Sequence, residues 1–125
     1  MPFAATILER RAGDYLRGYK KIGAPYMTLA FETTPLAAAH LRAGLHPFDF
    51  TCRPQVLRRG QNPAYEKIIR AFEKRTGVGA LLNTSFNLHG EPIVQTAADA
   101  WRVFQISGID ALLLNATLIE KKKSR

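Results

Sequence analysis

The fold is decided by the stretch NPAYEKIIRAFEKRTGVGALL, which spans residues 62–82. Asn62 and Pro63 are typical of a helix start, because an asparagine side chain can cap free N–H groups and proline suits the first helical position. Large apolar side chains then recur at helical spacing, at Tyr65, Ile68, Ile69 and Phe72. Gly77 predicts the end of this helix. Residues 78–82 are too few and too apolar for another surface helix, and they indicate a buried strand.

A second helix is predicted to begin at Thr96, whose hydroxyl can cap the free N–H groups, while Asp99 favours the positive end of the helix. Gly108 predicts its end. Residues 111–114 and 117–119 then indicate one or two closing strands. The predicted inner face of this helix consists of Ala100, Val103 and Phe104.

The first half of the chain carries weaker signals. Residues 26–32 have strand composition, and residues 35–41 suit a short helix that starts near Thr34. Residues 51–57 suit a strand, which Pro54 confines to the edge of a sheet or to the far side of a bulge.

Strands and helices thus alternate along the chain, without internal repeats. We predict an α/β fold with a mixed twisted sheet and flanking helices. We expect a single domain over residues 1–120, followed by a basic disordered tail over residues 121–125, because a terminal run of charges is typically solvated.

The composition fits one globular domain. The chain has 125 residues, of which 46% are hydrophobic and 22% charged, and a chain of this length can bury about two thirds of its unfolded surface. No apolar run approaches the ~20 residues of a membrane-spanning helix. The first residues, MPFAATIL, lack the basic region of a signal peptide, and charged residues follow them. We therefore predict a cytoplasmic protein that does not interact with a membrane.

The formal net charge of +8 raises the question of nucleic-acid binding. Much of the excess lies in the terminal run 121–125, and the other cations are spread along the chain without interleaved aromatic residues. A platform for stacking bases needs such aromatic residues. Small anionic ligands such as phosphates therefore explain the charge at least as well as RNA, which stays the less favoured partner.

Polar side chains directly follow the predicted buried strand, in NTSFNLHGEP at residues 83–92. The carboxyl ends of strands in open α/β sheets commonly deliver ligand-binding groups. Thr84, Ser85 and Asn87 are candidates to donate hydrogen bonds to phosphate oxygens. The alternative is a tight turn in which Asn87 and Gly90 adopt unusual backbone dihedrals.

Arg53 is a second candidate, because a guanidinium next to Pro54 on a semi-rigid segment suits bidentate binding of phosphate or carboxylate. The alternative for Arg53 is a surface salt bridge.

Other catalytic patterns are missing from the sequence. It contains no G-x-x-x-x-G-K-[ST] or G-x-G-x-x-G loop, and Ser85 lacks the G-x-S-x-G elbow of a nucleophile. The three histidines lack ligand spacing and the single cysteine excludes a cysteine-rich zinc site, so we predict no protein-bound metal. That cysteine, Cys52, is expected to be a small buried residue.

Several blocks of the sequence occur in the order of a known family. The run TGVGALLNTSFN at residues 76–87, followed by GEPIV at residues 90–94, strongly resembles the C-terminal domain of the O-carbamoyltransferases of nodulation-factor and antibiotic biosynthesis. Residues 24–27, 51–56 and 108–112 fall in the places that this resemblance requires. The resemblance covers essentially the whole chain.

The resemblance implies a YrdC-like fold that binds carbamoyl phosphate and ATP, with Mg²⁺ as the counterion of ATP. The two substrates would form a carbamoyl adenylate, from which a larger N-terminal domain transfers the carbamoyl group to an acceptor hydroxyl. Arg53 would hold the anionic carbamoyl phosphate or its adenylate, while Asn83 and Ser85 would contact the carbamoyl or nucleotide phosphate groups. On this basis Arg53 and Ser85 are assigned to catalysis, and Asn83, Thr84 and Asn87 to ATP binding.

The sequence departs from the family pattern at three places. Phe50 replaces a usual glycine, so the loop before Arg53 is expected to have a different backbone, because phenylalanine tolerates a positive φ poorly. His89 replaces a frequent arginine. Met1 stands in the place of an arginine, and from the resemblance we expect the basic strand that precedes this position in the family to be missing.

Two hypotheses follow. The first is an enzyme module that binds ATP and carbamoyl phosphate but needs a separate N-terminal carbamoyltransferase subunit for activity. The second is a catalytically inactive YrdC-like remnant that binds nucleotide or RNA. In both cases we expect an exposed apolar patch near Phe3 and Ile7, which predicts docking to an N-terminal subunit or a homo-oligomer.

Overall fold

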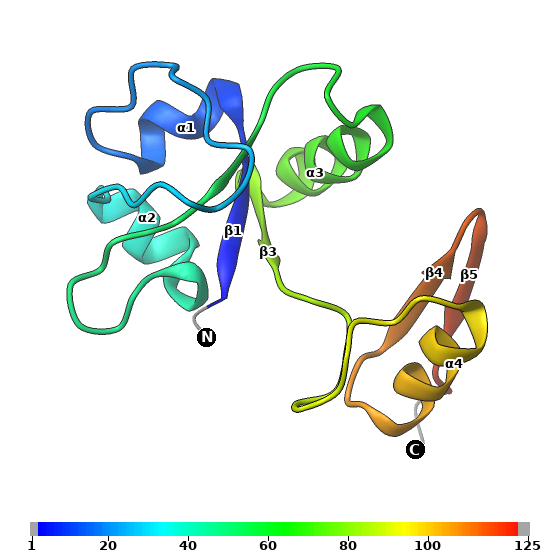
Figure 1. Cartoon of the computed structure of the whole chain (residues 1–125). Coiled ribbons are helices and arrows are strands. Elements are labelled where there is room, and N and C mark those ends of the chain that lie inside the picture. Colours follow the sequence, from blue (N-terminus) through cyan, green and yellow to red (C-terminus); the bar gives the residue numbers. More distant parts are fainter. Residues whose placement is uncertain (1–2, 123–125) are drawn as a thin grey trace. The chain divides into compact units, whose positions relative to one another are not determined.

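The computed structural model describes residues 3–122 of the 125 (Figure 1). The chain packs as two compact units, Met1–Thr84 and Ser85–Arg125, and each is described by itself. Helices and strands occur in both units, which confirms the mixed α/β class. Among the described residues, no helix is both long and apolar enough to cross a membrane.

The first unit is built on a three-stranded mixed sheet in the order β2-β1-β3. The central strand, β1 (Ala4–Leu8), is parallel to β2 (Gln55–Leu57) and antiparallel to β3 (Ala80–Asn83). Thr6 of β1 is paired with Gln55 on one side and with Leu81 on the other.

The burial of β1 corrects one expectation. Thr6 and Ile7 are fully buried, whereas Phe3 is 51% exposed. The prediction of an exposed apolar patch near Phe3 and Ile7 is therefore wrong for Ile7. The reason is topological, because β1 has a strand on each side and packed side chains over both faces of the sheet.

One face of the sheet packs against two short helices, α1 (Glu9–Tyr15) and α2 (Pro35–His40) (Figure 1). As predicted, α2 starts at Thr34, whose hydroxyl accepts a hydrogen bond from the backbone N–H of Ala37 at 3.3 Å. A 3-10 helix (Arg42–Gly44) follows α2. The core on this face includes Ala5, Ile7, Ala12, Tyr15, Leu16, Ala37 and Val56.

The other face of the sheet packs against α3 (Pro63–Thr76) (Figure 1). The predicted boundaries of this helix are confirmed. The side chain of Asn62 accepts a hydrogen bond from the backbone N–H of Tyr65 at 3.1 Å, and Gly77 ends the helix in the left-handed conformation, at φ 77°. The buried side chains of this second core are Leu8, Leu57 and Ile69.

The strand predicted after α3 is present but less buried than expected. Ala80, at the start of β3, is 1% exposed, whereas Leu82 is 51% exposed. β3 pairs with β1 on one side only and is therefore an edge strand. A short apolar run cannot show from sequence whether its strand lies at the centre or at the edge of a sheet.

Two other strand predictions need correction. Residues 26–32 form no strand: Phe31 makes a single bridge with Cys52, and the rest of the segment is turn and irregular backbone. The strand predicted over residues 51–57 is confined to β2, and Pro54 before it has no N–H group to pair. β2 is an edge strand, as Pro54 predicts. The sequence signals identify neither β1 nor α1.

The second unit consists of α4 (Ala97–Ile106) and an antiparallel hairpin of β4 (Ala111–Leu114) and β5 (Thr117–Glu120). Thr96 and Asp99 form a reciprocal cap, since the hydroxyl of Thr96 accepts from the backbone N–H of Asp99 at 3.1 Å and the Asp99 carboxylate accepts from that of Thr96 at 3.0 Å. The predicted helix and strands are confirmed. The predicted inner face of α4 is buried, at Ala100, Val103 and Phe104.

The second unit extends into the segment assigned to the basic tail. The backbone N–H of Lys121 donates to the carbonyl of Asp110 at 2.9 Å, and the Lys121 ammonium donates to the carbonyl of Ser107. Residues 123–125 of the predicted tail lie outside the described residues.

Candidate functional site

A polar network of side chains joins the three strands of the first unit. The hydroxyl of Thr6 donates to Gln55 Oε1 at 2.9 Å. The Asn83 amide nitrogen donates to Thr6 Oγ1 at 3.1 Å and to Gln55 Oε1 at 3.3 Å. Because Thr6 is fully buried, its hydroxyl needs these partners to offset the loss of water.

This network limits what Asn83 can offer a ligand. The amide nitrogen of Asn83 donates into the network, to Thr6 and to Gln55. The carbonyl oxygen of Asn83 is an acceptor and takes no part in these hydrogen bonds, so it is available to a ligand. An acceptor suits the N–H groups of an amide better than it suits the oxygens of a phosphate.

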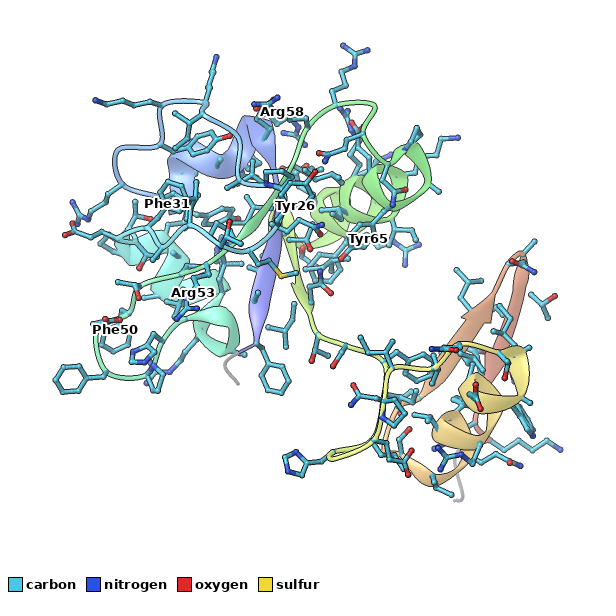
Figure 2. The ribbon with its side chains drawn as sticks, in the orientation of Figure 1. Tyr26, Phe31, Phe50, Arg53, Arg58 and Tyr65 are labelled. Carbon is cyan, nitrogen blue, oxygen red and sulfur yellow. The ribbon has the colours of Figure 1, made fainter. Side chains whose placement is uncertain are left out.

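Arg53 projects from a well-fixed segment of backbone. Its neighbours Cys52 and Pro54 are both buried, and Cys52 exchanges two backbone hydrogen bonds with Phe31, each of 2.9 Å. Arg53 itself is exposed, near the start of β2 (Figure 2). Within residues 3–122 it makes no hydrogen bond or ion pair with another side chain, so the alternative of a surface salt bridge is not observed there.

The loop before Arg53 corrects a further expectation. Phe50 adopts a positive φ of 58°, so the phenylalanine does take the left-handed conformation that glycine usually provides. Three hydrogen bonds hold the loop: the Thr33 hydroxyl donates to the Phe50 carbonyl at 2.7 Å, the Phe50 N–H to the His46 carbonyl at 2.9 Å, and the Thr51 N–H to Asp49 Oδ1 at 2.9 Å. The surrounding structure thus compensates for the strain at Phe50.

Ser85 and Asn87 belong to the second unit and contact each other there. The Ser85 hydroxyl donates to Asn87 Oδ1 at 2.5 Å. The Asn87 amide nitrogen donates to the backbone carbonyls of Leu88 at 3.0 Å and Glu91 at 2.8 Å. Gly90 has a φ of 82°. Together with these contacts it forms the turn that the sequence offered as the alternative to a ligand site. Asn87 contributes to this turn through its side chain and does not adopt a positive φ.

The predicted site residues therefore divide between the two units. Arg53, Asn83 and Thr84 belong to the first unit and Ser85 and Asn87 to the second. Thr84 is exposed, as is Ser85.

Sequence reasoning missed two members of the polar network, Thr6 and Gln55. Thr6 is the one polar residue in the apolar run Ala4–Leu8, and a polar residue inside such a run was the available signal. Gln55 gave no signal of its own, because its role depends on pairing with a strand far away in the sequence.

Cys52 and the titratable groups offer no further reactive centre. Cys52 is 1% exposed, as predicted, and burial raises the pKa of its thiol, so the thiol stays neutral. In the part of the chain that the structure describes, no three His, Cys, Asp or Glu side chains gather closely enough to hold a metal ion.

Comparison with protein families gives a match over nearly the whole chain. Residues 1–121 match the family described as the carbamoyltransferase C-terminus. The chain belongs to this family. Arg53 and the segment after β3 both lie within the matched range.

Several curated proteins share this carbamoyltransferase C-terminal sequence. An uncharacterised protein of Methanocaldococcus jannaschii is 42% identical over 98% of this chain and 23% of its own length. Nodulation protein NolO of Bradyrhizobium diazoefficiens is 37% identical over 97% of this chain and 22% of its own length. The 3'-hydroxymethylcephem-O-carbamoyltransferase of Amycolatopsis lactamdurans is 32% identical over 65% of this chain and 15% of its own length. The chain thus spans about a fifth of the length of the first two of these relatives.

Proposed function

We propose that this chain binds carbamoyl phosphate and ATP to form a carbamoyl adenylate, and that a separate N-terminal carbamoyltransferase domain transfers the carbamoyl group to an acceptor hydroxyl. Membership of the carbamoyltransferase C-terminal family supports this proposal. The single observation that carries it is the exposed Arg53 guanidinium, which has no partner within residues 3–122 and projects from a fixed backbone.

Arg53 is suited to the anionic group of carbamoyl phosphate. A guanidinium presents its donors in a planar fork that matches two phosphate oxygens. The buried neighbours Cys52 and Pro54 fix the backbone at this position, so less conformational entropy is lost when a ligand binds.

Asn83 is suited to the other end of the same substrate. Its carbonyl oxygen can accept a hydrogen bond from the carbamoyl NH₂ group, and the contacts of its amide nitrogen with Thr6 and Gln55 orient the amide. In this proposal Asn83 recognises the carbamoyl group and Arg53 the phosphate, which narrows the earlier assignment of Asn83 to ATP binding.

Thr84, Ser85 and Asn87 are proposed to contact ATP, which would bring Mg²⁺ held by its own phosphates. The Ser85 hydroxyl must rotate away from Asn87 to donate to a phosphate oxygen, since it now donates to Asn87. In the net reaction, carbamoyl phosphate, ATP and water give carbamoyl adenylate, pyrophosphate and phosphate. Fixed donors lower the barrier of such a step by stabilising the charge that develops on the phosphate oxygens.

The test is ligand-dependent stability. Carbamoyl phosphate should raise the melting temperature of the chain in proportion to the logarithm of its concentration, with a stabilisation of ~2.7 kcal/mol at one hundred times the Kd. Arg53→Ala should abolish this shift and change the stability without ligand by less than ~1 kcal/mol, because Arg53 is exposed.

Arg75→Ala is the matched control, since Arg75 is also exposed and lies in the last turn of α3. It removes the same charge and should keep the shift. No shift with wild-type chain at millimolar carbamoyl phosphate would refute the proposal, as would an equal loss in both variants.

A catalytically inactive remnant that binds nucleotide or RNA is the second candidate. The observation that favours it is the internal use of the Asn83 and Asn87 amide groups, which act as structural donors. Pyrophosphate release distinguishes the two candidates. Release that requires carbamoyl phosphate, in the presence of a separately expressed N-terminal carbamoyltransferase domain, supports the enzyme module, and nucleotide or RNA binding without release supports the remnant.

A further inference from the structure

Arg53 precedes β2 in the chain, and a second basic region of the first unit follows the end of β2, at Arg58 and Arg59. A hollow of about 590 Å³ is lined by residues of two segments, one within residues 22–25 and one within residues 58–61, directly after β2. Pockets of roughly 300–1,000 Å³ commonly hold small ligands. Figure 2 shows Arg58 beyond the end of β2 and Arg53 near its start. The residues that line the hollow are Ile22, Gly23, Pro25, Arg58, Arg59, Gly60 and Gln61.

The guanidinium of Arg58 has two neighbours in the first unit. Its Nε lies 3.4 Å from Glu9 Oε1. Its Nη2 lies against Gly23, where an added Cβ would come within 2.5 Å of it. Gly23 has a φ of 77°, so its backbone conformation favours glycine. A side chain at this position would also displace the Arg58 guanidinium.

The charge at this hollow is positive after local pairing is counted. Glu9 is the carboxylate paired with Arg58. Glu66 accepts a hydrogen bond from the Gly60 N–H at 3.0 Å and pairs with Arg70. Arg59 is exposed and makes no ion pair within residues 3–122. The charge of Arg59 contributes to the lowered pKa of Glu66, but its guanidinium donors hold no carboxylate among the described residues and are available to an anion.

An apolar wall accompanies these charges. Ile22 is 62% exposed, and Pro25 lines the same hollow. An arginine pair beside an apolar wall suits a ligand with an anionic group and a carbon-rich part, because the guanidinium groups bind phosphate oxygens while the wall contacts the remainder.

We propose that this hollow is a second anion-binding site, which holds the phosphate group of a small organic phosphate between Arg58 and Arg59. The site is separate from Arg53 and does not depend on the carbamoyl phosphate proposal. Its ligand is recognised by the two guanidinium groups and by contact with Ile22 and Pro25.

The experiment is a titration of the full chain followed by amide NMR signals, with phenyl phosphate and inorganic phosphate as the two probes. We expect saturable shifts of the Gly23, Gly60 and Gln61 signals. Phenyl phosphate should bind several-fold more tightly, because its ring can contact the apolar wall. Equal affinity for the two probes would overturn the assignment to an organic phosphate.

Substitutions locate the binding. Arg58→Ala and Arg59→Ala should each weaken phenyl phosphate binding about tenfold, the effect of losing one charge-assisted contact. Arg53→Ala and Arg75→Ala should leave it unchanged at this hollow. Equal weakening of phenyl phosphate binding by all four variants would overturn the proposal. So would NMR shifts scattered over basic residues elsewhere in the chain.

A pair of glycine variants tests the role of the fixed guanidinium. Gly23→Ala should weaken binding although both arginines remain, because its Cβ displaces the Arg58 guanidinium. Gly18→Ala is the control, since Gly18 also has a positive φ, of 65°, but its Cβ would meet no atom within 4 Å. Equal binding by the two variants would show that the position of Arg58 is irrelevant and would overturn the site as described.

Discussion

Replacing Thr6 by valine removes the centre of the polar network without opening a cavity, because the two side chains have nearly the same shape. Thr6 is fully buried, and its hydroxyl takes part in two hydrogen bonds, at 2.9 Å with Gln55 and at 3.1 Å with Asn83. Gln55 and Asn83 still bond to each other at 3.3 Å after the change. Neither partner is therefore left without any hydrogen bond.

The expected loss follows from these two bonds. An intramolecular hydrogen bond contributes ~0.5–1.5 kcal/mol net, so Thr6→Val should lower the free energy of unfolding by about 1–3 kcal/mol. Thr6→Ser keeps both bonds and loses one buried methyl group, at a cost of about 1 kcal/mol. Thr28→Val is the surface control, since Thr28 is exposed, and it should change stability by less than ~0.5 kcal/mol.

Urea unfolding measures these differences, and the NMR signals of the Asn83 side-chain amide distinguish lost hydrogen bonds from lost packing. These signals should shift strongly in Thr6→Val and little in Thr6→Ser. A Thr6→Val variant as stable as Thr28→Val, with unchanged Asn83 signals, would refute the conclusion that Thr6 ties the three strands together.

Two further predictions concern titratable groups. Hydrogen bonds from the side chain and backbone of Thr96 hold the pKa of Asp99 below its ordinary value. The stability that this carboxylate contributes is present above the unfolded-state pKa of about 3.9 and is lost as the pH falls through the lower folded-state pKa. The difference in melting temperature between wild type and Asp99→Asn should therefore shrink below about pH 4, and a constant difference down to pH 2 would contradict this role. Because Cys52 is 1% exposed and burial also raises the pKa of its thiol, a thiol reagent should label Cys52 no faster than the structure opens, and rapid labelling of native protein would contradict its burial.

Local signals in the sequence were sufficient for α3, α2 and α4. Each of these helices starts at a capping side chain, at Asn62, Thr34 and Thr96, and these caps form within four residues of chain. Such contacts depend on neighbouring residues alone, so a sequence reveals them.

The sheet could not be predicted to the same extent, because its contacts join distant segments. The buried position of Ile7 and the exposure of Leu82 both depend on the order β2-β1-β3. Residues 26–32 have strand composition but find only one bridge partner, at Cys52. Strand propensity records how well side chains fit a sheet and not whether a partner strand is present.

The sequence also indicated only part of the candidate site, because some of its contacts join segments that are distant in the sequence. Arg53 was identified from its own chemistry and is exposed with its backbone fixed, as expected for a ligand-binding residue. The use of the Asn83 donors by Thr6 and Gln55 was not predictable, since it depends on the register of three strands.

The central position of β1 has a consequence for synthesis on the ribosome. Residues 4–8 are made before their partners, which are residues 55–57 and 80–83. Translation adds about 5–20 residues per second, so the apolar segment of β1 emerges several seconds before β3 can pair with it. Even after β2 has emerged, β1 keeps one unpaired edge during that interval, and an exposed apolar strand edge is the kind of segment that chaperones bind and that aggregates when it is left unprotected.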